Sequence, residues 1–188
     1  MTTALVVVDV QRDFCPGGAL AADGGERILP AVNRHLEDAV AGGLTIYATR
    51  DWHPETTSHF KAFGGEWPTH CVQDTPGAEF HPGLHLPAGV IVVSKGLDPE
   101  HPGYSAFDGL TPDGNTFVAD LRARGIDRLL VAGIATEYCV KQTVLDARRE
   151  GLEATVLLDA VTGIDAQPGD VTRALDEMSA AGAQLTAS

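Results

Sequence analysis

The chain alternates short apolar runs with segments in which apolar residues recur every three to four positions. The runs are rich in β-branched residues and continuous, which is typical of parallel strands buried on both faces. They lie at residues 4–8, 45–49, 90–94, 129–132, 154–158 and 184–186. The segments with helical spacing lie at residues 29–41, 116–124, 141–149 and 171–181. This pattern predicts a three-layer α/β fold, a mainly parallel six-stranded sheet with helices on both faces.

The connections between these elements are uneven in length. A stretch of about forty residues after Asp51 holds much of the proline, histidine and glycine, and it is typical of a long functional loop region. The sequence contains no internal repeat and no linker. We therefore predict that residues 1–188 form a single domain, long enough to bury a sizeable core.

Charge and cysteine content exclude several classes of partner. The formal net charge is −13, from 13 basic and 26 acidic residues, and this disfavours both nucleic acid and an anionic membrane surface. No apolar run approaches the roughly 20 residues that span a bilayer. Three cysteines without a Cys-x-x-Cys pair are typical of reduced thiols. These features predict a cytoplasmic protein.

Chemically useful residues follow four of the predicted strands. They are Asp9, Asp51, Lys95 and Cys139. Because binding sites in open parallel sheets form beyond the carboxyl ends of the strands, we expect these side chains to share one edge. Cys139 also begins a helix, where the helix dipole favours a thiolate. The alternative is that Cys139 is a small core residue, as many free cysteines are.

Three of these residues form a plausible set for nucleophilic catalysis. The Asp9 carboxylate could take the thiol proton of Cys139 and later protonate a departing amine. The Lys95 ammonium would stabilise both anions. The set suits hydrolysis of an amide through a covalent thioester. The alternatives are that Asp9 caps a loop and that Lys95 is a solvated surface charge.

A second group of polar residues begins at Asp51. His53 lies on the same short extended segment, and His59 and His70 follow in the long loop. One carboxylate and up to three imidazoles suit zinc, iron or manganese, and the spacing leaves a coordination position open. The alternative is that these histidines are merely solvent-exposed. Cys71 could compete as a ligand, although we expect it to pack inward.

Six short motifs occur in order along nearly the whole chain. They are Val-Val-Asp-Val-Gln-Arg-Asp-Phe at 7–14, Asp-Trp-His-Pro at 51–54, Trp-Pro-Thr-His-Cys at 67–71, Ser-Lys-Gly at 94–96, Tyr-Ser-Ala-Phe at 104–107 and Gly-Ile-Ala-Thr-Glu-Tyr-Cys-Val at 133–140. In this ordered set the chain resembles the nicotinamidase (pyrazinamidase) branch of the isochorismatase-like cysteine hydrolases. Each motif is only moderately specific, but the ordered set is strong.

The resemblance implies a role for each residue of the catalytic motifs. Cys139 would be the nucleophile, Asp9 the general base and then the general acid, and Lys95 the charge that orients them. The bond between Ile134 and Ala135 matches a cis peptide of the family. Its geometry would direct the Ala135 N–H, together with that of Cys139, into an oxyanion hole.

The resemblance also implies a metal site and an aromatic pocket. One divalent metal ion, with zinc favoured over iron or manganese, would be held by Asp51, His53, His59 and His70. It would contact the pyridine nitrogen of the substrate, directly or through water. The expected pocket residues are Phe14, Trp67, Tyr104, Ile134 and Tyr138. For the aromatic residues among them, Tyr104 above all, the alternative is packing in the core.

Two residues depart from the family pattern. Arg12 replaces an asparagine, which puts the surroundings of the metal in doubt, and Tyr138 is bulkier than usual, which puts the pocket width in doubt.

The implied activity is hydrolysis of nicotinamide, and of pyrazinamide, to the acid and ammonia, feeding NAD salvage. The alternatives are another small-amide hydrolase of the superfamily, attack by metal-bound hydroxide, or a non-catalytic metal-binding or thiol-sensing module. The sequence leaves open whether the protein is a monomer or a homo-oligomer.

Overall fold

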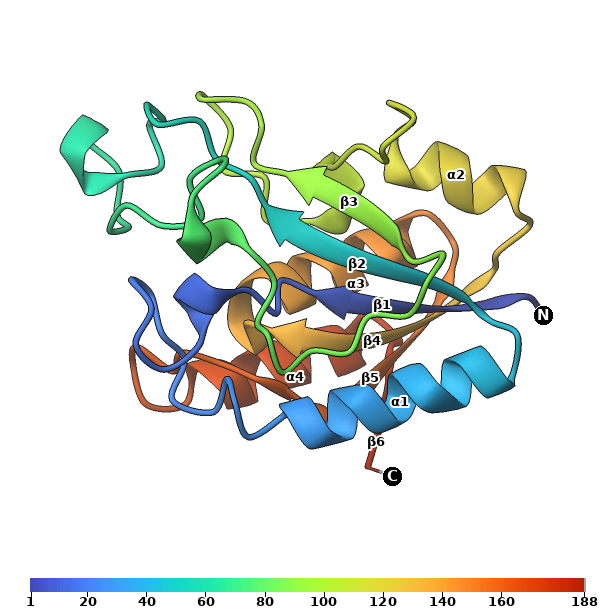
Figure 1. Cartoon of the computed structure of the whole chain (residues 1–188). Coiled ribbons are helices and arrows are strands. Elements are labelled where there is room, and N and C mark those ends of the chain that lie inside the picture. The colour runs from blue at the N-terminus through green and yellow to red at the C-terminus, as the bar shows by residue number, and fades with distance from the viewer. Residues whose placement is uncertain (188) are drawn as a thin grey trace.

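The computed structural model describes residues 1–187, and its strands form one six-stranded sheet in the order β3-β2-β1-β4-β5-β6 (Figure 1). Each of the five strand pairings is parallel. The strands are β1 (Thr3–Val8), β2 (Thr45–Asp51), β3 (Ile91–Lys95), β4 (Arg128–Ile134), β5 (Glu153–Thr162) and β6 (Gln184–Thr186). The predicted fold class is confirmed.

Helices cover both faces of the sheet. They are α1 (Leu29–Ala41), α2 (Phe117–Ala123), α3 (Lys141–Arg149) and α4 (Asp170–Ala180). The chain moves outward from β1 to β2 in one direction and from β4 to β5 in the other. Because such crossovers are right-handed, the connecting helices lie on opposite faces. Accordingly, α1 packs in one core cluster, whereas α2, α3 and α4 pack in the other (Figure 1).

The central strand β1 explains why its residues form a continuous apolar run. Leu5 and Val7 pack toward α1, whereas Ala4, Val6 and Val8 pack in the cluster beneath the other three helices. All five side chains are almost completely buried. Burial of each larger aliphatic side chain contributes about 1.5–3 kcal/mol to folding, so both faces of β1 hold the layers together.

The strands all end on one side of the molecule, where the long loops gather (Figure 1). Strand β5 extends to Thr162, beyond the predicted end at residue 158. The register between β4 and β5 shifts between Val131 and Gly133, and β5 then resumes pairing with Ile134. This irregularity carries β5 to the edge at which the candidate residues lie. Within residues 1–187, every helix is too short or too polar to cross a membrane.

Candidate active site

The four residues predicted at the strand ends lie at one edge of the sheet. Asp9 directly follows β1, Asp51 and Lys95 are the last residues of β2 and β3, and Cys139 lies just after β4. Strands β1 and β4 are neighbours although β2 and β3 lie between them in sequence. The chain changes winding direction between these two strands, which is where doubly wound sheets form binding sites.

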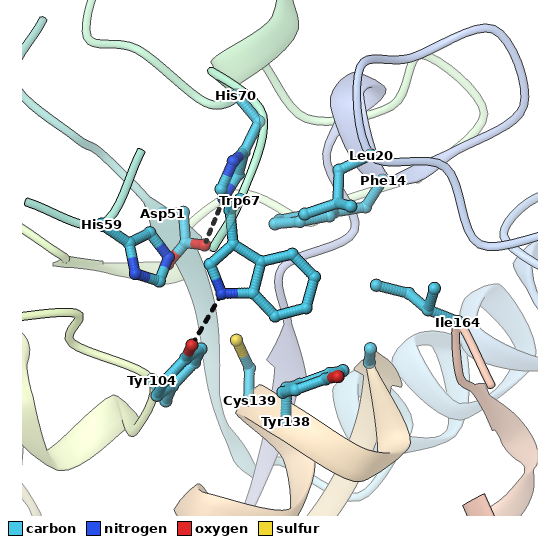
Figure 2. A pocket seen from close by; sticks show the side chains of 11 residues that line it. Phe14, Leu20, Asp51, His59, Trp67, His70, Tyr104, Tyr138, Cys139 and Ile164 are labelled. Carbon is cyan, nitrogen blue, oxygen red and sulfur yellow. Dashed lines mark hydrogen bonds and ion pairs between the residues drawn. The ribbon is translucent and has the colours of Figure 1, made fainter. Parts of the chain in front are cut away.

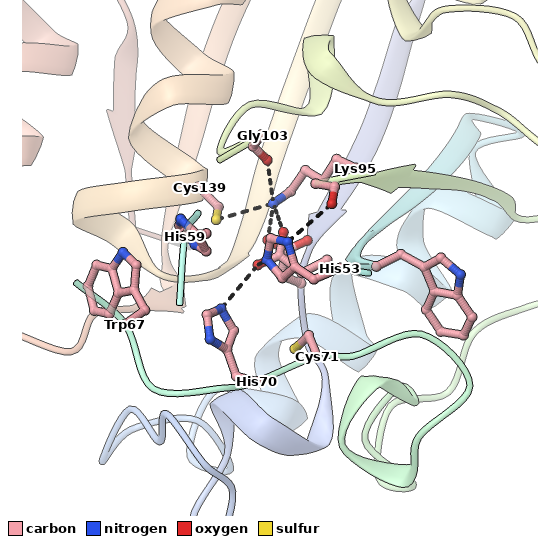
Figure 3. A network of polar contacts seen from close by, with 12 residues as sticks. His53, His59, Trp67, His70, Cys71, Lys95, Gly103 and Cys139 are labelled. Atoms are coloured by element: carbon pink, nitrogen blue, oxygen red, sulfur yellow. Dashed lines mark hydrogen bonds and ion pairs between the residues drawn. The ribbon is translucent and has the colours of Figure 1, made fainter. Parts of the chain in front are cut away.

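The Lys95 ammonium is the centre of a buried polar network (Figure 3). Its Nζ lies 2.7 Å from Asp9 Oδ2, 2.5 Å from Asp51 Oδ1 and 3.3 Å from Cys139 Sγ. The Gly103 carbonyl accepts a further hydrogen bond from Nζ at 3.3 Å. The structure therefore brings the predicted trio together and adds Asp51 to it.

Asp9 is held in place by Thr49 on the neighbouring strand. The Thr49 hydroxyl donates a 2.6 Å hydrogen bond to Asp9 Oδ1, and the Asp9 N–H donates to the same hydroxyl at 3.2 Å. The other carboxylate oxygen, Oδ2, is left to face Lys95. Sequence analysis missed Thr49, and its only signal was a polar residue at the end of an otherwise apolar strand.

Burial and charge together set the protonation states of this network. Burial would lower the pKa of Lys95, but the Asp51 and Asp9 carboxylates overcome this effect and hold it well above its usual range. Burial would raise the pKa of Asp51, but Lys95 and His53 hold it well below its usual range. For Asp9, burial outweighs the attraction of Lys95 and raises the pKa, which suits a group that takes and returns a proton.

Burial opposes the tendency of Cys139 towards a thiolate that the start of the helix predicts. Burial raises the pKa of the thiol well above its usual value; the Lys95 ammonium opposes the shift, and Asp9 and Asp51 reinforce it. A carboxylate oxygen of Asp9 and the Cys139 sulfur lie within 4.8 Å of each other, so the thiol faces the predicted base.

Cys139 lies on a π-helical turn, Thr136–Val140, that leads directly into α3. Such turns occur frequently at functional sites. The Ala135 carbonyl accepts hydrogen bonds from the N–H groups of Tyr138 at 3.0 Å and Val140 at 3.1 Å. The peptide bond between Ile134 and Ala135 is cis, as the resemblance implied. The oxyanion role of the Ala135 and Cys139 N–H groups stays a prediction.

The predicted metal-binding histidines also converge. Ligand atoms of His53, His59 and His70 lie within 4.8 Å of one another. The Nδ1 of His53 lies 3.1 Å from the Gly96 carbonyl, and that of His70 lies 2.7 Å from the Pro68 carbonyl. These contacts orient both rings so that Nε2 is the ligand atom, as is usual for metal-binding histidines.

The donor set fits a divalent metal ion. His53 Nε2 is buried and has no hydrogen-bond partner among residues 1–187. It lies 3.6 Å from Asp51 Oδ2, and His70 Nε2 lies 3.9 Å from the same oxygen. Burial and the neighbouring imidazoles lower the pKa of His59 to about 4, and burial lowers the pKa of His70. Neutral imidazoles beside a carboxylate oxygen are the ligands that such ions prefer.

Two neighbouring residues take no part in this metal site. Cys71 is fully buried in the core cluster, as expected from the sequence. Arg12 is exposed, and its Nε pairs with Glu79 Oε2 at 3.2 Å. Gln11, which sequence analysis missed, instead holds the backbone of Asp51 with its side chain. Its Nε2 donates to the Asp51 carbonyl at 2.8 Å, and its Oε1 accepts from the Asp51 N–H at 2.8 Å.

A small pocket opens beside Cys139 (Figure 2). Four of the five predicted pocket residues line it, namely Phe14, Trp67, Tyr104 and Tyr138. The fifth, Ile134, instead packs in the core cluster on the α1 face of the sheet, so this expectation is corrected. Leu20 and Ile164 also line the pocket, and no motif in the sequence identified them.

Three aromatic side chains form a connected wall of this pocket (Figure 2). The indole N–H of Trp67 donates to the Tyr104 hydroxyl at 2.8 Å. Tyr138 meets Trp67 edge-on, with ring centroids 4.9 Å apart, and stacks on Tyr104 at 6.0 Å. Flat apolar walls of this kind suit an aromatic ring as ligand. Tyr138 lines the pocket beside Cys139 (Figure 2).

The fold and site define an α/β protein with a buried cysteine, carboxylate and ammonium beside a histidine-rich metal site. The isochorismatase domain family model matches residues 3–188, and the chain belongs to this family. It is 42% identical over 189 residues to the nicotinamidase/pyrazinamidase of Mycobacterium tuberculosis, covering 98% of each chain.

Solved structures agree with this assignment. The pyrazinamidase of Pyrococcus horikoshii in complex with zinc has a TM-score of 0.91 and 45% identity, and the match covers 100% of both chains. PnC1 from L. infantum in complex with nicotinate has a TM-score of 0.85 and 34% identity, and the match covers 99% of this chain and 92% of that one.

Proposed function

We propose that the protein is a nicotinamidase that hydrolyses nicotinamide, and also pyrazinamide, to the carboxylic acid and ammonia. The observation that carries the proposal is the contact of Lys95 with Asp9 and Cys139 at the base of an aromatic pocket. The relatives named nicotinamidase and the neighbour bound to nicotinate support the choice of substrate. The product nicotinate can enter NAD salvage.

The first half of the reaction forms a thioester. The Asp9 carboxylate takes the Cys139 thiol proton as sulfur attacks the amide carbonyl carbon. Lys95 stabilises the negative charge while the proton moves. The N–H groups of Ala135 and Cys139 hold the carbonyl oxygen as it becomes an oxyanion. When the carbon–nitrogen bond breaks, Asp9 returns the proton to the departing nitrogen, and ammonia leaves.

The second half of the reaction restores the enzyme. A water molecule enters the position that ammonia has left, and Asp9 takes a proton from it as its oxygen attacks the thioester carbon. The carbon–sulfur bond then breaks, the acid is released, and Cys139 recovers its proton from Asp9. Each proton that Asp9 accepts is therefore delivered within the same half of the cycle, and no oxidant or reductant is required.

The pocket holds the substrate ring against this machinery. Phe14, Trp67 and Tyr138 provide flat apolar surfaces for it. Asp51, His53, His59 and His70 would hold the divalent metal, for which we propose zinc over iron or manganese. When bound, the metal would supply a Lewis acid for the pyridine nitrogen and would so help to orient the ring.

The proposal is tested by ammonia release from nicotinamide, with and without a chelator. We expect turnover by the metal-loaded protein and its loss in the chelated protein. Cys139→Ala should retain its metal, measured by elemental analysis, and lose turnover. Mass spectrometry of trapped enzyme should place an acyl adduct on Cys139. Turnover by Cys139→Ala would instead favour attack by metal-bound hydroxide, and no ammonia from any pyridine carboxamide would refute the proposed function.

A further inference from the structure

Glu137 is a buried carboxylate that the proposed chemistry does not use. It lies on the π-helical turn two residues before Cys139, and only 6% of its surface is exposed. Its Oε1 accepts two hydrogen bonds from the connection between β5 and α4, from the Ile164 N–H at 2.8 Å and the Asp165 N–H at 2.7 Å. Hydrogen bonds to an ionised carboxylate are among the stronger ones in proteins.

The surroundings of Glu137 leave it little freedom. A Cβ atom at Gly163 would lie 2.2 Å from Glu137 Oε2, so a glycine is needed for the carboxylate to approach this backbone. Asp165 adopts a positive φ of 51°, and its Oδ1 accepts from the Val171 N–H at 3.3 Å at the start of α4. The segment between β5 and α4 is therefore held by Glu137 near β5 and by the Asp165 contact at the start of α4.

Ile164, which Glu137 holds by its backbone, lines the substrate pocket. Its side chain lies on the far side of the pocket from Tyr104 and His59 (Figure 2). The π-helical turn that carries Cys139 therefore also carries Glu137, whose carboxylate holds the backbone of Ile164 in place. A ring in the pocket would meet Ile164 on one side and reach Cys139 on another.

We propose that Glu137 is a positioning residue for substrate binding, which fixes Ile164 at a set distance from Cys139 and so determines the width of ring that the pocket admits. This inference rests on the proposed function, because it concerns the same pocket and a six-membered aromatic amide. If Glu137 only anchored a surface loop, its loss would lower stability without changing substrate affinity or selectivity.

Four variants of the metal-loaded enzyme separate these cases. In Glu137→Gln the amide oxygen still accepts both N–H groups, whereas in Glu137→Asp the shorter side chain cannot reach them. Ile164→Ala removes the pocket contact itself, and the fourth variant combines Glu137→Asp with Ile164→Ala. Each is assayed for ammonia release from nicotinamide and from a ring-methylated nicotinamide, with KM and kcat determined separately.

We expect Glu137→Asp to raise KM for nicotinamide about tenfold, the effect of losing one methylene-sized pocket contact, with a smaller change in kcat. Its preference for nicotinamide over the methylated ring should narrow. Glu137→Gln should keep the KM of the wild type. The combined variant should be no worse than Ile164→Ala alone, because both changes disturb one contact.

Multiplicative effects in the combined variant would overturn the inference, as would a Glu137→Gln variant as impaired as Glu137→Asp. A fall in kcat with unchanged KM would also overturn it. Amide hydrogen exchange needs no substrate and is the second readout. The Ile164 and Asp165 amides should exchange faster in Glu137→Asp, and unchanged exchange would contradict the inference. Failure of the proposed function is seen separately, as absence of ammonia release by the wild type.

Discussion

Replacing Lys95 with methionine would remove the ammonium that two buried carboxylates share. Methionine has nearly the same length, so the change removes charge and hydrogen bonds with little change in volume. The Nζ that is lost lies 2.7 Å from Asp9 and 2.5 Å from Asp51, and all three side chains are buried. Without it, the two carboxylates repel each other in a medium that solvates neither.

The expected loss of stability is large. Removing one partner of a buried ion pair costs about 3–5 kcal/mol. In a domain of this size 1 kcal/mol shifts the melting temperature by about 2–4 °C, so we expect a decrease of about 6–20 °C. Burial already raises the pKa of Asp9, and loss of the Lys95 charge should raise this pKa further, so that a larger fraction of Asp9 is protonated at pH 7. A protonated Asp9 cannot accept the thiol proton, so kcat should fall by about 100- to 10,000-fold.

Thermal melting of chelated protein at pH 7 measures the first effect, and ammonia release by the metal-loaded protein measures the second. The matched control is the double variant Asp9→Asn with Lys95→Met, which removes both charges. It should recover part of the lost melting temperature while remaining inactive. The reasoning is refuted if Lys95→Met melts within about 2 °C of the wild type, or if the double variant melts below the single one.

Three further predictions concern the histidine cluster and its support. In the folded protein the pKa of His59 is about 4, below its ordinary 6.5, so between these pH values the unfolded chain binds a proton that the folded chain does not. The melting temperature of chelated protein should therefore fall as the pH is lowered from about 6.5 to 4. His59→Gln should reduce this dependence of the melting temperature on pH. Gln11→Leu leaves buried backbone groups unpaired and should cost about 3 kcal/mol in a urea titration. Gly96→Ala places a Cβ 2.5 Å from the His53 ring, so metal affinity should fall about 10–100-fold in a competition titration. Gly89→Ala is the control: Gly89 has a similar positive φ, but no atom lies near its added Cβ, so metal affinity should be unchanged.

Much of the site was predictable because of one property of parallel sheets. Their strands end at the same edge, so the residues that follow the apolar runs must meet there. This argument placed Asp9, Asp51, Lys95 and Cys139 together without any knowledge of contacts. It also gave the layers of the fold, since a continuous apolar run such as that of β1 requires cover on both faces.

The residues that sequence analysis missed act through their position in the fold. Ile164 reaches the pocket because β5 extends past a register shift, and Thr49 meets Asp9 through the pairing of β1 with β2. Gln11 binds backbone forty residues away. None of these contacts has a local pattern. Ile134 was misplaced for the same reason, because its motif gives its neighbours along the chain and not the face toward which its side chain points.

The pKa of the Cys139 thiol shows how burial can oppose a local rule. The start of a helix favours a thiolate, but this preference is worth only about 0.3–2 kcal/mol. Complete burial and two nearby carboxylates act on the same sulfur and raise its pKa despite Lys95. A raised thiol pKa favours loss of the proton as the sulfur attacks, and Asp9, within 4.8 Å of the sulfur, is the proposed acceptor.

Asp51 joins two groups of residues that the sequence separates. Its Oδ1 contacts Lys95 at 2.5 Å, and its Oδ2 lies 3.6 Å from His53 Nε2, so one carboxylate borders both the nucleophile and the metal site. A substitution of Asp51 would therefore disturb Lys95 and the metal ligands at the same time. Its kinetic effect could not be assigned to either. The Cβ of Gly96→Ala would meet the His53 ring, and Gly89→Ala controls for the strain at positive φ, so this pair is the sharper test of what the metal contributes.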